Sequence, residues 1–181
     1  LGPSAGRAQF DWSWSLVAGS FLFNTWVYDG GVMAEEGVIN KDTYFVAVKV
    51  FLEKDGNFLI MKDKWGAWDL PGGRIKKDEF DTPLDVVITR KMSEELGDGI
   101  KYTVGKPVVF MRHQREEAGL GGQTVRIFAI GYEGKLLEGE PQLGDHHVEM
   151  KWADIKTFKP EDFFTGGWLK GVQDYLAIKR G

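Results

Sequence analysis

Three glutamates and an arginine stand close together in the chain, in a pattern that suits metal-assisted phosphate chemistry. Glu79 precedes a predicted helix, and Arg90, Glu94 and Glu95 lie toward the end of that helix. Glu94 and Glu95 are about 100° apart on a helical wheel, so both can flank one pocket beside the turn that follows Gly73. Carboxylate oxygens and a free glycine carbonyl are ligands that Mg²⁺ prefers, and Mg²⁺ neutralises phosphate oxygens. The cluster therefore predicts a site for a divalent cation and a phosphoester.

The helix that must position these acids is predicted between Thr82 and Gly97. Thr82 can cap its start, and Pro83 suits the first helical position. Gly97 can end it by adopting the left-handed conformation. Apolar residues recur at helical spacing between these limits: Leu84, Val87, Ile88, Met92 and Leu96. A loop is expected just before this helix, because Pro71, Gly72 and Gly73 end any strand there.

Predicted strands precede and follow this helix along the chain. Apolar and β-branched runs predict strands over residues 44–52, 58–61, 104–111, 124–132 and 148–152. Asp55-Gly56 predicts a tight turn between the first two, and the polar, glycine-rich residues 114–123 predict a long hairpin loop between the next pair. Residues 168–176 show helical spacing of apolar side chains. This order predicts an α/β or α+β domain with a mixed sheet.

The segment from Gly73 to Gly97 resembles the signature of the Nudix family, G-x5-E-x7-R-E-U-x-E-E-x-G-U, where U is aliphatic. Gly73 and Glu79 match its first part, and Arg90, Glu94 and Gly97 match its second part in register, together with Met92 and Glu95. The order of strands and helices extends the resemblance over residues 44–179. It implies a Nudix-type α/β/α sandwich with a mixed β-sheet over residues 41–181, preceded by an N-terminal extension of uncertain origin over residues 1–40.

Two departures from the signature bear on activity. Ten residues separate Glu79 from Arg90 where the signature has seven, and the extra three fit best as residues 80–82, before the helix. Loops accept such insertions at little entropic cost, so the fold should survive while the position of Glu79 changes. Lys91 stands where the signature has a glutamate, and its ammonium can lie beside Glu94 and Glu95 on the same helical face. Weakened metal binding is the expected result.

The resemblance implies a Mg²⁺-dependent hydrolase, with Mn²⁺ as a substitute ion, that cleaves a pyrophosphate bond in a nucleoside diphosphate linked to another moiety. The metal ligands would be the Gly73 carbonyl, Glu79, Glu94 and Glu95, and Arg90 would orient a carboxylate. Glu149 resembles the downstream acid that completes such sites and is a candidate to activate water. The alternative is a nucleotide-binding or regulatory module of the same fold with lost or reduced hydrolysis, because Lys91 carries the wrong charge. A purely structural role is a third hypothesis.

Substrate contacts are predicted from basic and aromatic side chains near the motif. Arg74 and Arg112 are candidates for phosphate binding, and Trp68 for stacking on a nucleobase. The partner implied is a small nucleotide. The family often dimerises, so the resemblance also allows a homodimer.

Composition narrows the function classes. The 181 residues carry a net charge of -4, so no global basic field favours nucleic acid or an anionic membrane. The absence of cysteine excludes thiol nucleophiles and thiolate zinc sites and is compatible with the cytoplasm. The apolar stretch over residues 12–28 is interrupted by polar residues and is too short to span a membrane; it predicts a hairpin turning near Gly19.

Overall fold

The computed structural model describes residues 27–28, 31–32 and 41–181. The chain divides into two compact units, residues 1–41 and residues 42–181. In the first unit, strand β1 (Val27–Tyr28) pairs antiparallel with strand β2 (Gly31–Val32). The predicted hairpin near Gly19 lies outside the described residues, and the predicted domain boundary at residue 40 stays a prediction.

The second unit is built on a seven-stranded mixed sheet. Its strands are β3 (Phe45–Lys54), β4 (Asn57–Asp63), β5 (Trp68–Asp69), β6 (Gly72–Arg74), β7 (Lys101–Glu117), β8 (Gln123–Glu138) and β9 (His147–Asp154). β3 pairs parallel with β8, whereas the other pairs are antiparallel. The mixed sheet that the sequence predicted is therefore confirmed.

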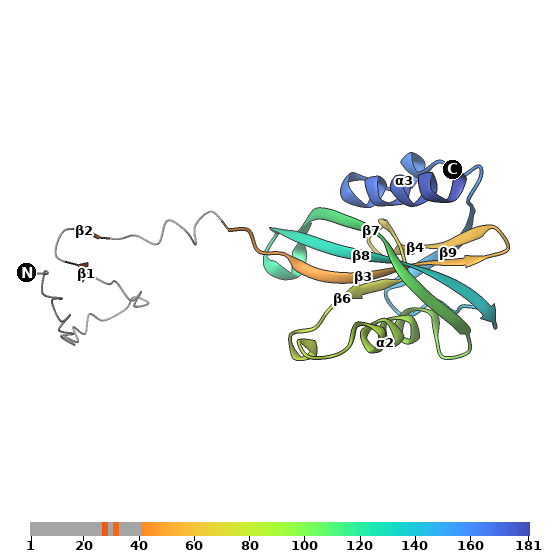
Figure 1. Ribbon diagram of the computed structural model, residues 1–181, viewed down its shortest axis with the longest axis horizontal. Helices are drawn as coiled ribbons and strands as arrows, with labels where there is room; N and C mark the ends of the chain where they lie inside the picture. The colour runs from red at the N-terminus through yellow and green to blue at the C-terminus, as the bar shows by residue number, and fades with distance from the viewer. Residues whose placement is uncertain (1–26, 29–30, 33–40) are drawn as a thin grey trace, which may run out of the picture. The chain divides into compact units, whose positions relative to one another are not determined.

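Two helices cover opposite faces of this sheet (Figure 1). They are α2 (Leu84–Leu96) and α3 (Gly166–Arg180). β3 shows why both faces are covered: Val48 and Val50 pack in one buried cluster with α2, while Ala47 and Phe51 pack in another with α3. Side chains alternate along a strand, so one apolar strand supplies both cores. The α/β/α sandwich is confirmed.

Short 3-10 turns interrupt the connections between these elements. They are η1 (Lys77–Glu79), η2 (Ala118–Leu120) and η3 (Pro160–Asp162). η1 lies in the loop between β6 and α2, directly before the predicted insertion at residues 80–82. No helix in the described part of the chain is long and apolar enough to cross a membrane.

The hairpin between the first two predicted strands is confirmed. Lys54 pairs with Asn57 across a turn in which Asp55 has φ 49° and Gly56 has φ 78°. Two successive residues with positive φ match the twist of antiparallel strands, and Asp-Gly adopts them readily.

The hairpin of β7 and β8 differs from the prediction. The segment predicted as a long loop continues both strands, with Gln114 paired to Arg126 and Glu117 to Gln123, so that the connection shrinks to a short turn around η2. The side chains of Gln114 and Arg126 are exposed. The polar residues did not indicate strands because the paired ends of β7 and β8 are exposed on both faces, so residues 114–116 and 123–124 show no alternation of apolar and polar side chains.

Candidate functional site

Helix α2 carries the candidate acids, and it begins one residue later than predicted. Pro83 precedes its first residue, and no side chain caps the helix. The predicted cap, Thr82, instead donates its backbone N–H to the carbonyl of Glu79 at 3.0 Å, which closes a turn within the inserted segment. Gly97 ends the helix at the predicted residue, with a positive φ of 77°, but its ψ of 169° lies outside the predicted left-handed helical conformation.

Glu79 remains in contact with α2 despite the insertion. The guanidinium of Arg90 donates from Nε to Oε1 of Glu79 at 2.5 Å and from Nη2 to Oε2 at 2.7 Å. The backbone N–H of Lys76 also donates to Oε2, at 2.7 Å. These contacts, the Arg90 hydrogen bond first, hold the pKa of Glu79 below its ordinary value. The arginine therefore fixes the loop on the helix.

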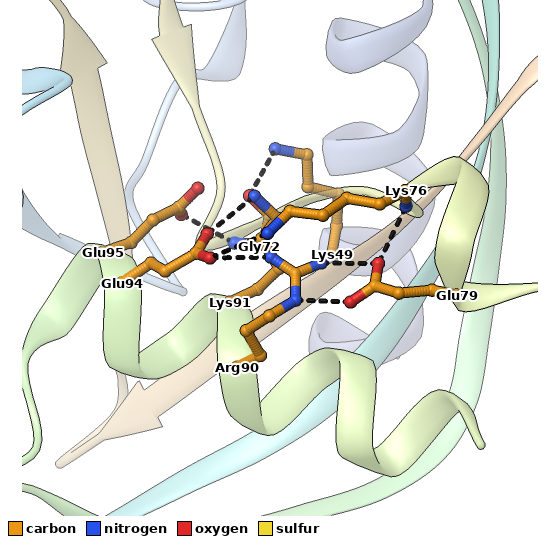
Figure 2. A network of polar contacts seen from close by, with 8 residues as sticks. All are labelled: Lys49, Gly72, Lys76, Glu79, Arg90, Lys91, Glu94 and Glu95. Carbon is orange, nitrogen blue, oxygen red and sulfur yellow. Dashed lines mark hydrogen bonds and ion pairs between the residues drawn. The ribbon is translucent and has the colours of Figure 1, made fainter. Parts of the chain in front are cut away.

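Glu94 is held by three basic side chains from α2 and the preceding loop (Figure 2). Lys91 Nζ donates to Oε2 at 2.9 Å, Arg90 Nη1 donates to Oε1 at 2.8 Å, and Lys76 Nζ lies 3.5 Å from Oε1. The hydrogen bond from Lys91 is the main cause that lowers the pKa of Glu94 to about 2. Both oxygens of Glu94 are thus occupied by cations of the chain itself.

The carbonyl that faces the site belongs to Gly72, one residue before the predicted Gly73. The backbone N–H of Val50 in β3 donates to the carbonyl of Pro71 at 2.8 Å, and the N–H of Ile75 donates to the carbonyl of Val46 in β3 at 2.9 Å. These two hydrogen bonds lie on either side of Gly73. Antiparallel partners alternate between bonded and non-bonded pairs, so the backbone of Gly73 is used within the sheet. The peptide groups of Gly72 point away from β3 instead. The carbonyl free of the sheet is therefore that of Gly72 and not that of Gly73, while a metal-binding role for either stays a prediction.

Glu95 lies on the other side of Gly72 and is partly buried. Its Oε2 accepts the backbone N–H of Gly72 at 2.8 Å. Burial raises the pKa of Glu95 to about 7, and the neighbouring charge of Lys49 opposes that rise. Glu94 and Glu95 are adjacent in sequence but lie in opposite environments, one saturated by cations and one partly desolvated.

Lys49 is a site residue that the sequence reasoning missed. It lies in the middle of β3, and its side chain is only 5% exposed. Its Nζ donates to Oδ2 of Asp69 at 2.7 Å and to the carbonyl of Leu70 at 3.0 Å, and it lies 3.5 Å from the carbonyl of Gly72. A buried ammonium requires such partners. The signal was available, since Lys49 is the one polar residue in the run Val46–Leu52.

Within the described part of the chain, three other predicted site residues make no contact with the acids of α2. Glu149 is exposed on β9, and its ion-pair partner is Lys62, at 3.9 Å. Trp68 packs edge-on against Phe163, with ring centroids 5.2 Å apart. Arg112 is exposed on β7.

Arg74 lies on β6 beside Gly73, but it is committed to another partner. Its Nη1 donates to Oε2 of Glu117 at 2.8 Å, and Nη2 donates to Oε1 of the same carboxylate. The pair ties β6 to the end of β7. An arginine held by both oxygens of a carboxylate is less available for phosphate.

A comparison with protein-family models places the fold and the motif in one family. The model of the NUDIX domain matches residues 43–169, which is most of the chain. The chain belongs to the Nudix family. No curated protein matches the sequence.

Solved structures agree with the Nudix fold, all at low sequence identity. The MutT protein of Methanosarcina mazei Go1 is 21% identical, with a TM-score of 0.59, over 76% of this chain and 95% of that one. An ADP-ribose pyrophosphatase of Streptococcus suis is 15% identical, with a TM-score of 0.54, over 77% and 94%. A C. elegans Ap4A hydrolase is 16% identical, with a TM-score of 0.54, over 76% and 98%.

The divalent cation that the Nudix resemblance implies does not fit the side chains as they are arranged. Within residues 27–28, 31–32 and 41–181, no three His, Cys, Asp or Glu side chains gather to hold a metal ion. Glu79 is bound by Arg90, and Glu94 is bound by Lys91 and two further cations. Glu95 and the Gly72 carbonyl remain, and the carbonyl already lies near the ammonium of Lys49. Oxygen ligands are present, but the basic side chains of the protein already bind them or lie beside them.

Proposed function

We propose that this Nudix chain binds a nucleoside diphosphate linked to another moiety and hydrolyses the pyrophosphate bond between its phosphates. The observation that supports this most is the juxtaposition of Glu95 and the Lys49 ammonium at Gly72 with the Lys91 ammonium at the adjacent Gly73. The similar structures from Streptococcus suis and C. elegans are named for hydrolysis of ADP-ribose and Ap4A. A diphosphate is the chemical group common to the proposed substrates.

Basic side chains of the site would bind the diphosphate. Lys76 is half-exposed and Lys91 partly exposed, so both can exchange part of their contact with Glu94 for phosphate oxygens. Arg90 would keep Glu94 and the η1 loop in place during this exchange, through its bonds to Glu79 and Glu94. Ammonium and guanidinium groups stabilise negative charge that develops on phosphate oxygens.

Glu95 would accept the proton of the attacking water. Its Oε2 is oriented by the N–H of Gly72, which leaves Oε1 as the accepting atom. A carboxylate with a pKa about 7 takes up a proton near neutral pH more effectively than an ordinary one. Glu149 is the weaker candidate for this role, because its contact is with Lys62 on β4.

A second candidate function is nucleotide binding with lost or much reduced hydrolysis. The contact of Lys91 Nζ with Glu94 favours it. Lys91 stands where the family signature has a glutamate, and it neutralises Glu94 instead of adding another acid. Binding and regulation need only the cationic groups and the Gly72 loop. Turnover of a bound nucleotide therefore distinguishes the two candidates.

A panel assay tests the proposal. ADP-ribose, a nucleoside diphosphate sugar and Ap4A would be incubated with the protein, with and without Mg²⁺ or Mn²⁺, and the released nucleotides quantified, while calorimetry measures binding of each compound. Turnover that Glu95→Gln lowers by about 100-fold supports the hydrolase. Binding without turnover supports the second candidate, and neither binding nor turnover contradicts both.

A matched control separates the site from general charge effects. Glu138→Gln makes the same chemical change at an exposed glutamate of β8 whose partner is Lys101. We expect it to leave turnover and binding unchanged. If both variants lose activity equally, the role given to Glu95 is wrong.

Cytoplasmic localisation and a homodimer are also proposed, on the composition and the family resemblance. Cell fractionation and light scattering of the purified protein test them. A secreted pool or a monomer at micromolar concentration would contradict the respective proposal.

A further inference from the structure

Charged side chains around Gly72 balance one another without any added ion. The acids are Asp69, Glu79, Glu94 and Glu95, and the cations are Lys49, Lys76, Arg90 and Lys91. Their formal charges cancel. A glutamate at position 91, as in the family signature, would change the total by two units and leave a formal charge of about -2, which one divalent cation neutralises.

Lys91 is turned toward the site and away from solvent. Its side chain is 17% exposed, and its Nζ lies 2.9 Å from Oε2 of Glu94. The chain of Lys91 also crosses directly over Gly73: a Cβ placed on that glycine would lie 2.9 Å from Cε and 3.2 Å from Nζ. The glycine therefore makes room for the lysine. An ammonium that merely tolerated this position would extend into water, as long basic side chains readily do.

We propose that the Lys91 ammonium replaces one divalent cation in the nucleotide-free protein. This inference concerns the site of the proposed function and rests on it. The substrate-free site then has no net charge to attract a metal ion. The ligand that it accepts is a nucleotide diphosphate that brings its own divalent cation from solution.

The physical basis is competition for the same carboxylate. An ion that used Glu94 as a ligand would have to displace the hydrogen bonds of Lys91 and Arg90, and it would then lie beside two displaced cations. Lys49 adds a further positive charge near the Gly72 carbonyl. A divalent cation would be repelled strongly by these nearby ammonium and guanidinium groups in a partly desolvated site.

Binding of Mn²⁺ alone tests the inference, with the free ion measured by electron paramagnetic resonance in the absence of nucleotide. We expect the wild-type protein to show no site filled below about 1 mM Mn²⁺. Lys91→Glu should acquire one site with roughly 100-fold higher affinity, equivalent to about 2.7 kcal/mol. Lys91→Met removes the charge without adding an acid and should give an intermediate gain of roughly 10-fold.

Lys170→Glu is the matched control. Lys170 pairs with Asp174 along the exposed face of α3, as Lys91 pairs with Glu94 along α2. We expect no Mn²⁺ site in this variant. Urea unfolding in EDTA verifies that each variant is folded before the titration.

Two results would overturn the inference. One is a wild-type Mn²⁺ site filled well below 1 mM without nucleotide, and the other is the same Mn²⁺ affinity in Lys91→Glu and Lys170→Glu. If Lys91→Glu does not fold, the wild type and Lys91→Met decide the outcome. The panel assay is independent: failure of all nucleotides to bind would remove the proposed function, whereas tight Mn²⁺ binding would remove only the role of Lys91.

Discussion

Replacement of Glu95 by glutamine should remove a pH-dependent cost to folding. Burial raises the pKa of Glu95 from an ordinary value of 4.5 to about 7. Between these values the folded protein holds a proton that the unfolded chain has lost, so stability falls as pH rises from about 4.5 to about 7. Glutamine is uncharged throughout this window and retains an oxygen that can accept the N–H of Gly72.

The magnitude follows from the two pKa values. At 1.36 kcal/mol for each pKa unit, ionisation of buried Glu95 costs about 3 kcal/mol above pH 7. Relaxation around the charge lowers this figure, so we expect Glu95→Gln to be more stable than the wild type by about 1–3 kcal/mol at pH 8. At pH 4 the wild-type carboxyl is neutral when folded, and the two proteins should differ by less than about 0.5 kcal/mol.

Urea unfolding in EDTA at pH 4, 6 and 8 measures the effect. Glu138→Gln serves as the control, because Glu138 is 65% exposed and paired with an exposed lysine. Its difference from the wild type should stay within about 0.5 kcal/mol at every pH. Parallel pH profiles for the wild type and Glu95→Gln, or a variant less stable at pH 8, would refute the burial of an unfavourable charge at this position.

Three further changes test the rest of the structure by the same unfolding measurement. Gly72→Ala should lower the free energy of unfolding by more than about 3 kcal/mol, because φ is 127° and the new Cβ would lie 2.2 Å from a backbone oxygen. Gly66→Ala, at φ 95° but with open space around the new Cβ, should lower it by only about 1 kcal/mol. Because its pKa is lowered, ionised Glu94 stabilises the folded protein, by about 1 kcal/mol after screening of its 42% exposed side chain. This stabilisation is present above pH 4.5 and is lost as the pH falls toward 2. Glu94→Gln should not show this loss of stability in acid. Tyr175→Phe removes a 2.7 Å hydrogen bond to Glu53 and should cost about 1 kcal/mol, and an unchanged stability would contradict that bond.

Local patterns predicted the elements well where one physical rule dominated. The turn at Asp55-Gly56 requires positive φ at two residues, and few other dipeptides supply it. The α2 stripe was predictable because Val87, Ile88 and Met92 all face one core. The spacing of Lys91 from Glu94 likewise predicted that they share a helical face, and they are in contact.

Tertiary geometry decided the features that the sequence did not reveal. Whether Gly72 or Gly73 offers a free carbonyl depends on the hydrogen-bonding register between β6 and β3, which no local pattern encodes. Thr82 had the right chemistry for a cap, but the insertion placed its N–H in a turn with Glu79. Lys49 stands out in the sequence as the one polar residue of an apolar strand, but its partners, such as Asp69, are distant in sequence, so the contacts that place it in the site could not be predicted.

The basic residues at positions 90 and 91 also determine how the site is held together before a ligand arrives. A cluster of carboxylates without a cation repels itself, and an ion that binds the folded site stabilises it. In this chain Lys91 and Arg90 bind Glu94, and Arg90 binds Glu79, so the η1 loop and α2 are joined in the ligand-free protein. The same contacts that order the loop oppose a free metal ion. Arg90 therefore preorganises the site, whereas Lys91 opposes an ion alone, and Lys91→Glu should gain Mn²⁺ affinity while the contact between Arg90 and Glu79 keeps the loop on α2.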